Sequence, residues 1–446
     1  MPCFTNSTVE NVSGAALTYT MKKFINDPAL ITFLGSINIA FNFMVAPFIA
    51  WKSDRIWTRF GRRKPFVICG WIGLIISLLF VPLAPNIWAL SVAIVVYQFF
   101  QDFAFTGPYE PLEWEVVPLP QRGRAAATNA FMNNCAGLYF NFFMIKHFHE
   151  VYNLRINLDF LWPRAEAGGA SCLTITGEQI IYWGAAALVS VMLAHVCLNI
   201  KETPVHSVLM GERFSMKRYL KGVFGERQWL LIYLLIFSQI SMNQGLAQLS
   251  PLLITEQFHY SMNVLGNIGG LTTALRIIIL VPIAGYLSDK MDRLRLYQIG
   301  LLVSACHPIS YWCFVKFIAA NHVPSAQAIV GFEIFGSFVH VMGNITLAPL
   351  LFDFVPRDKM GTAFGGMTLA RGMVKLTVNF GVGIWVSLYS RLFMPKGQYD
   401  YMSGYLYVFM IGVFGCLASF YFASERKKGR VIAHGRIEIE NESRGT

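Results

Sequence analysis

The sequence predicts an all-α integral membrane protein, a helix bundle of two six-helix halves. Three observations support this prediction: the composition, a series of long apolar spans, and a motif that recurs in both halves. Hydrophobic residues make up 55% of the chain and charged residues only 14%, whereas soluble domains carry about 25% charged residues. Too little charge is available to cover the surface of a soluble protein, so the soluble classes are excluded.

Eleven apolar spans are long enough to cross a bilayer, for which about 20 residues suffice. Their length and glycine content fit helices, and lipid otherwise permits only a closed barrel. The spans are approximately 28–51, 66–84, 88–110, 125–146, 179–199, 229–252, 264–287, 298–319, 326–350, 362–388 and 402–423.

The first 24 residues, MPCFTNSTVENVSGAALTYTMKKF, contain an apolar stretch too short for a full crossing, and they also carry Glu10. They lack the basic start and apolar centre of a secretory signal. We expect the second half of a clipped first helix, as in a fragment or a mis-started product. Glu10 would then be an intramembrane acid and a further candidate for proton coupling.

Basic residues alternate between the loops. Segments 52–65, 111–124, 200–228, 288–297, 355–361 and the tail from 424 hold 25 of the 36 Lys and Arg residues. By the positive-inside rule these segments are cytoplasmic, and so is the C-terminal tail. Membrane topology therefore explains the net charge of +11, and nucleic-acid binding has no further support.

A duplication is visible when the two sides of the longest basic linker are compared. SDRIWTRFGRR follows the span that ends near 51, and GYLSDKMDRLR closes the span that ends near 287, with Asp54 and Asp289 in matching places. Two six-helix halves account for eleven spans and a clipped first helix. We expect an N-terminal bundle over 1–199, a linker over 200–228, a C-terminal bundle over 229–423 and a tail over 424–446.

These residues resemble the major facilitator superfamily, whose signature between helices two and three is Asp-Arg followed by Gly-Arg-Arg or Gly-Arg-Lys. The longer form SDRIWTRFGRRKPF looks most like the sucrose–proton symporters and the glycoside, pentoside and hexuronide cation symporters. QRGRA at 121–125 is similar to the opening of the fifth helix in many relatives. The resemblance covers nearly the whole chain, and it implies alternating access between two halves.

The basic loops predict a gating network. An acid among arginines can form charge-assisted pairs that hold helix ends together and that still break when the halves move. The predicted gating residues are Asp54, Arg55, Arg59, Arg62, Arg63, Asp289, Lys290 and Arg124. The alternative is that the loops only set topology by binding anionic lipid, although topology does not require Asp54.

Polar side chains fall on single faces of several spans, and ionisable groups inside a membrane are functional candidates by default. The predicted lining of a central cavity is Asp102, Arg276, Glu333, His340, Arg371, Lys375, Gln98, Gln101, Asn38, Asn133, Gln244 and Gln248. The alternative is structural, because such groups also form hydrogen bonds or ion pairs between helices. We favour Asp102 as the coupling acid, since helices four and eight of the resembling sugar symporters carry an acid and an arginine.

Together these observations predict a secondary transporter that moves a small polar solute, a sugar or glycoside, in symport with protons. The alternative is a carrier or exporter of a different solute, and sodium is a second candidate for the coupling ion. A membrane enzyme or a non-transporting sensor is disfavoured because HExxH, GxSxG and P-loop patterns are missing. We expect a monomer in the plasma or inner membrane, without a cofactor or metal.

Overall fold

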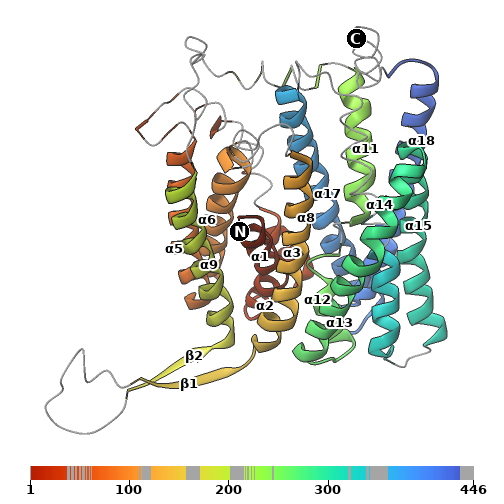
Figure 1. The fold of residues 1–446 in the computed structure, drawn as a ribbon. Helices are drawn as coiled ribbons and strands as arrows, with labels where there is room; N and C mark the ends of the chain where they lie inside the picture. The colour runs from red at the N-terminus through yellow and green to blue at the C-terminus, as the bar shows by residue number, and fades with distance from the viewer. Residues whose placement is uncertain are drawn as a thin grey trace, which may run out of the picture.

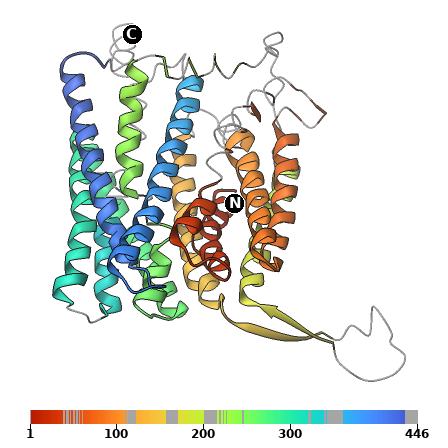
Figure 2. The ribbon, with the colours of Figure 1, turned by 180° about the vertical axis from the view of Figure 1, so that it is seen from behind.

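The protein is an all-α membrane bundle whose helices run between two ends (Figures 1 and 2). The computed structural model describes residues 2–37, 63–109, 122–156, 171–200, 227–243, 246–319, 323–337 and 360–431, with single positions between these ranges. We call the end with the strands β1 and β2 the hairpin end. The opposite end, where α5 begins and α18 finishes, is the tail end.

The first half begins with a continuous helix of three parts whose start lies part-way between the two ends (Figure 1). Asp27 caps the second helix, which has Pro28 at its first position, where a missing N–H costs nothing. The elements of this half are α1 (Pro2–Asn11), η1 (Val12–Ala16), α2 (Leu17–Lys22), α3 (Pro28–Gly35), α5 (Lys64–Phe80), η2 (Val81–Leu83), α6 (Ile87–Ala104), η3 (Phe105–Tyr109), α8 (Arg122–Tyr139), η5 (Phe140–Met144), η6 (Ile145–His147) and α9 (Gly177–Asn199).

The second half differs from its prediction at the seventh helix. A single span was expected over 229–252, but α11 ends at Asn243, and a new helical segment starts at Ser250 with Pro251 in its first turn. Pro cannot donate a backbone hydrogen bond, so it favours a restart over continuation. The elements are α11 (Arg227–Asn243), α12 (Ser250–Leu252), η7 (Leu253–Gln257), α13 (Met262–Leu275), η8 (Arg276–Leu280), α14 (Val281–Lys290), α15 (Arg293–Cys313), η9 (Phe314–Ile318), α17 (Met360–Phe393), η11 (Tyr401–Ser403) and α18 (Gly404–Lys427). Residues 326–337 are also helical.

A two-stranded antiparallel hairpin projects from the bundle between the fifth and sixth helices, which the helical prediction did not include (Figure 1). β1 (Val151–Ile156) pairs with β2 (Ser171–Thr176). At its root, Glu150 accepts hydrogen bonds from Tyr152 and His147, and these contacts lower the pKa of the Glu150 carboxyl. Thr176 and Gln179 form a capping box that starts α9.

Six helical segments among the described residues are long and apolar enough to cross a membrane. They are Lys64–Leu83, Ile87–Ala104, Gly177–Asn199, Met262–Ala284, Arg293–Ile318 and Tyr401–Lys427. The first helix is not among them, because Asn6, Ser7, Asn11 and Ser13 lower its hydropathy. These side chains make hydrogen bonds inside the protein, which removes the cost of placing them in a membrane.

Among the residues that the structure describes, the two halves contact each other at the hairpin end. α3 packs on α17, and the fifth helix (α8, η5, η6) packs on α13. One buried apolar core contains the first half together with residues 249–268 and 382–408 of the second half. Among the described residues, the tail-end part of the second half has a separate core over 229–240, 294–305 and 367–370. The shared core therefore joins the halves at one end of the molecule.

Candidate functional site

An ion pair closes the hairpin end between the first and seventh helices. Lys22 Nζ lies 3.0 Å from Glu256 Oε2, with side chains that are 19% and 35% exposed. Tyr401 ties the pair to the second half, because its hydroxyl donates to Glu256 Oε2 at 2.7 Å and accepts from Lys22 Nζ at 3.2 Å. Nearby, the Tyr19 hydroxyl donates to the Pro251 carbonyl at 2.9 Å. Every one of these contacts except the Tyr401–Glu256 bond crosses between the halves.

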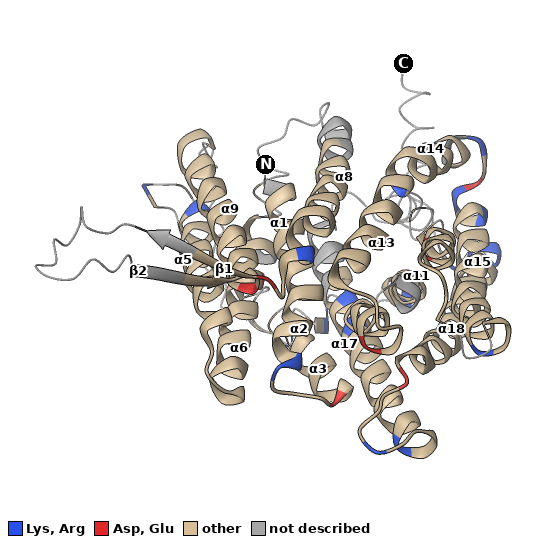
Figure 3. Ribbon diagram, turned by 90° about the horizontal axis from the view of Figure 1, so that it is seen from below, with Lys and Arg blue, Asp and Glu red and all other residues tan. Residues whose placement is uncertain are grey.

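A second cross-link joins the second and eleventh helices. Asp27 Oδ1 accepts from Ser387 Oγ at 2.5 Å, and Asp27 Oδ2 lies 3.7 Å from Arg391 Nη2. The helices approach closely one turn further in, where a Cβ on Gly383 would meet Thr32 Oγ1 at 1.9 Å and the Pro28 carbonyl oxygen at 2.8 Å. Charged residues are sparse in the view onto this end, where α2, α3 and α17 lie close together (Figure 3). The closure therefore combines two ion pairs with close helix packing.

The first helix carries a polar face toward its own half. Ser7 Oγ donates to Asn133 Oδ1 at 2.8 Å. Ser13 Oγ lies 2.5 Å from the Tyr97 hydroxyl and donates to Gln101 Oε1 at 3.0 Å. These bonds join α1 and η1 to α8 and α6, and they hold the helix in a fixed rotation.

Another face of the first helix points toward the other half. The Glu10 side chain is exposed within the protein and accepts a 3.4 Å hydrogen bond from Asn6. Lys375 on α17 acts on Glu10 electrostatically, without a direct ion pair between these two described side chains. One turn further along, a Cβ on Gly14 would meet no atom within 4 Å. Lys375 of the opposite half is therefore close enough to act on Glu10, and the Cβ direction of Gly14, one turn along the helix, is free of other atoms.

Two predicted residues on α6 lie next to this site. Asp102 and Gln101 are buried, and both Glu10 and Asp102 act electrostatically on the Tyr97 hydroxyl. Gln98 is also buried, and its Nε2 donates to the Leu34 carbonyl on α3 at 3.2 Å. Tyr97 therefore interacts electrostatically with both acids. The sequence pattern did not single it out.

Gln248 contributes to the contact between the halves. It is buried in the turn before α12, and a Cβ on Gly35 would lie 2.3–2.9 Å from its terminal amide atoms. Only a glycine leaves room for that amide against the second helix. Asn38 and Gln244, two other predicted cavity residues, lie outside the described residues, as does His340.

The remaining predicted cavity residues belong to the second half. Arg276 starts η8, and neither its Nε nor the Oγ1 of buried Thr272 has a hydrogen-bond partner among the described residues. Glu333 acts electrostatically on the buried tyrosines Tyr311 and Tyr405, whose rings meet edge-on at 5.0 Å. Arg371 is exposed on the same helix as Lys375.

The predicted gating residues are described only in part. Asp54, Arg55 and Arg62 lie outside the described residues. Arg59 is exposed, Arg63 is buried at the N-cap of α5, and Lys290 Nζ lies 4.5 Å from the Tyr286 ring centre. Asp289 belongs to the last turn of α14 and Arg124 to the first turn of α8.

Lys64 was not predicted, although it belongs to the same basic run. It is buried, and its Nζ donates to the carbonyls of Cys197 at 2.6 Å and Ile200 at 3.0 Å. A cation at these carbonyls satisfies the end of α9 and complements its dipole. The basic run therefore also fastens the third helix to the sixth.

A model of the Major Facilitator Superfamily matches residues 3–144 and 167–378. The chain belongs to this superfamily. No curated protein sequence matches it. The superfamily assignment and the fold identify the chain as a membrane transporter.

Solved structures with a similar fold are themselves transporters. An auto-inhibited POT family peptide transporter is 10% identical with a TM-score of 0.67, covering 97% of this chain and 96% of that one. A bacterial homolog of the human lysosomal transporter Spinster, inward-facing and occupied, is 14% identical with a TM-score of 0.66 and 95% coverage of both chains. The nucleoside transporter NupG is 11% identical with a TM-score of 0.59, covering 95% of this chain and 98% of its own. At these identities the likeness concerns the fold alone.

Proposed function

We propose that this transporter moves a small polar solute, a sugar or glycoside, in symport with protons by alternating access. The observation that carries the proposal is the exposed Glu10 on the first helix, within electrostatic range of Lys375 in the opposite half. An acid and a base on opposite sides of the pathway can link the charge of one to the approach of the two halves.

The orientation follows from the basic loops, which put the tail end in the cytoplasm. The hairpin end then faces outward, and its ion pairs Lys22–Glu256 and Asp27–Arg391 hold the outer side shut. We infer that the site beside Glu10 is reached from the cytoplasm when the outer side is shut, as alternating access requires. The gating network around Asp54 and Asp289 would form when the halves close at the tail end.

Proton coupling fits the chemistry of the Glu10 site. When Glu10 is ionised, it attracts Lys375 across the pathway; when it takes up a proton, that attraction disappears. A proton moving down ~100 mV releases about 2.3 kcal/mol, enough for roughly fiftyfold accumulation of solute. Asp102 is the second candidate for this role, because it lies near the same Tyr97 hydroxyl.

The sugar branch rests on the SDRIWTRFGRRKPF motif and on the amides and hydroxyls around the site. Asn6, Ser13 and Gln101 offer donors and acceptors suited to a hydroxyl-rich solute. We further propose a monomer in the plasma or inner membrane with the C-terminal tail in the cytoplasm.

The experiment is uptake of mono- and disaccharides into proteoliposomes, with and without an imposed pH gradient. We expect gradient-dependent accumulation of at least one sugar. The E10Q variant should still bind that sugar, but it should only equalise the sugar concentration across the membrane and not accumulate it. E150Q, which changes an acid outside the pathway, should accumulate it normally. If no sugar shows gradient-dependent uptake, the proposal is wrong, and the alternative function, a carrier of another solute, is favoured.

A further inference from the structure

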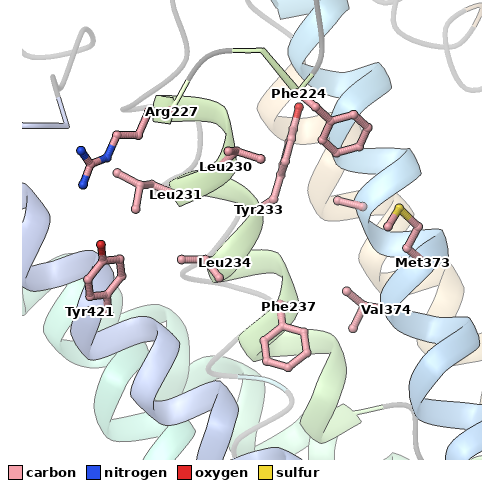
Figure 4. A pocket seen from close by; sticks show the side chains of 11 residues that line it. Phe224, Arg227, Leu230, Leu231, Tyr233, Leu234, Phe237, Met373, Val374 and Tyr421 are labelled. Carbon is pink, nitrogen blue, oxygen red and sulfur yellow. The ribbon is translucent and has the colours of Figure 1, made fainter. Parts of the chain in front are cut away.

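An apolar groove of about 490 Å³ lies on the side of the second half, near the tail end (Figure 4). α11 forms its floor, and α17 and α18 form its walls. The lining includes Leu230, Leu234 and Phe237 from the floor, with Met373 and Val374 on one wall and Tyr421 on the other. Leu230, Met373 and Tyr421 are each about half exposed. Seen from behind, α11 is visible between α17 and α18, so this is an outer face of the bundle (Figure 2).

The length of the groove matches one leaflet of a bilayer. Its floor runs from Arg227 to Phe237 along α11, which at 1.5 Å per residue is about 15 Å. The hydrocarbon core of a bilayer is about 30 Å thick. A single acyl chain from the leaflet at the tail end therefore has the length to follow this floor.

The tail-end mouth of the groove carries a cluster of cations. Arg227 is itself part of the lining, and its Nη2 lies 3.0 Å from Glu425 Oε2. Lys428 Nζ and Arg430 Nη1 bind the same carboxylate at 3.0 and 2.9 Å. Glu425 is 1% exposed, whereas each of the three cations is more than half exposed. Three bases on one acid leave a net charge of +2 directed to the surface.

We propose that the groove binds an anionic phospholipid of this leaflet, with an acyl chain between α17 and α18 and its phosphate on Arg227. Such a lipid requires an apolar surface for its acyl chain and positive charge for its phosphate, and the described residues offer both, with three cations against one acid at the mouth of the groove. A zwitterionic lipid would supply the chain without the net negative charge. Inorganic phosphate would supply the charge without the chain.

The test is a titration of the purified protein in detergent, read by native mass spectrometry. Dioleoyl phosphatidylglycerol is compared with dioleoyl phosphatidylcholine, and with inorganic phosphate as competitor. R227Q should weaken phosphatidylglycerol binding about fivefold, because one surface cation is worth about that factor. R227K should retain the binding. K52Q, which removes an exposed cation from the other half, should leave it unchanged.

A second variant tests the groove without altering charge. M373W fills the wall of the groove at a position that is 51% exposed, so it should reduce binding of both lipids while the protein stays folded. Equal affinity of the wild type for the two lipids would overturn the proposal. So would equal effects of R227Q and K52Q, complete displacement of lipid by millimolar phosphate, or unchanged binding in M373W.

Discussion

Loss of the Lys22–Glu256 pair should open the hairpin end. In E256Q the amide can still accept from the Tyr401 hydroxyl, but its attraction for the Lys22 ammonium is lost. Exposed ion pairs are worth 0.2–1 kcal/mol, and this pair is shielded on the Lys22 side, so we take the upper end of about 1 kcal/mol. The equilibrium between closed and open forms then moves about fivefold toward opening.

Gly14 provides a reporter position, because its Cβ direction is open space one turn from Glu10. In a background with the eight native cysteines replaced, G14C is labelled with a membrane-impermeant maleimide from the hairpin side. E256Q should raise the labelling rate about fivefold. Exchanging the charges in K22E/E256K should return it toward the wild-type rate.

E150Q is the matched control, since Glu150 belongs to the hairpin end and its carboxylate bonds to His147 and Tyr152 of its own half. If E256Q leaves the labelling rate unchanged, or if E150Q raises it equally, the ion pair does not hold the halves together. In that case, packing of α3 on α17 would be what holds the halves together at the hairpin end.

Three further predictions follow from other contacts. G383A should lower the melting temperature by an amount equivalent to about 1–3 kcal/mol, because a methyl group there meets Thr32 and the Pro28 carbonyl. The control is G331A, where a Cβ meets no atom within 4 Å. If both variants lower the melting temperature equally, the steric explanation is wrong. K64M should destabilise the first half by about 1 kcal/mol in thermal unfolding, since two carbonyls at the end of α9 lose the buried ammonium that binds them. An unchanged melting temperature would show that water replaces the ammonium. The D54N variant should insert into the membrane normally and lose transport in the proteoliposome assay. Full transport in D54N would show that Asp54 is not needed for gating and that the basic loop only sets membrane topology.

The sequence predicted the membrane bundle and the polar faces of its helices, because both depend on local composition and period. Gln101 and Asn133 were predicted to line a cavity, and each makes a hydrogen bond to the first helix, a contact of the kind that the structural alternative described. Glu10 was predicted as an intramembrane acid only on the condition that residues 1–24 are the second half of a clipped first helix; the structure is helical over 2–22.

The hairpin-end closure could not be predicted in the same way. Charges are ordinary at helix ends, and no regular spacing relates the four residues of the two ion pairs along the chain: Lys22, Asp27, Glu256 and Arg391. Their pairing depends on how the two halves dock. Asp27 caps α3, but its ion pair with Arg391 depends on tertiary packing. The β1–β2 hairpin was missed because it lies outside the apolar spans on which the prediction was based.

The two ion pairs at the hairpin end also predict that salt on one side of the membrane affects the protein's conformation more than salt on the other side. The charges of Lys22, Glu256, Asp27 and Arg391 are partly in contact with water, and ions at physiological strength screen such charges over about 8 Å. Raising ionic strength on the hairpin side alone would loosen both links, while the same salt on the tail side would not reach them. The resting conformation of this transporter would then depend on the salinity of the medium that bathes its hairpin.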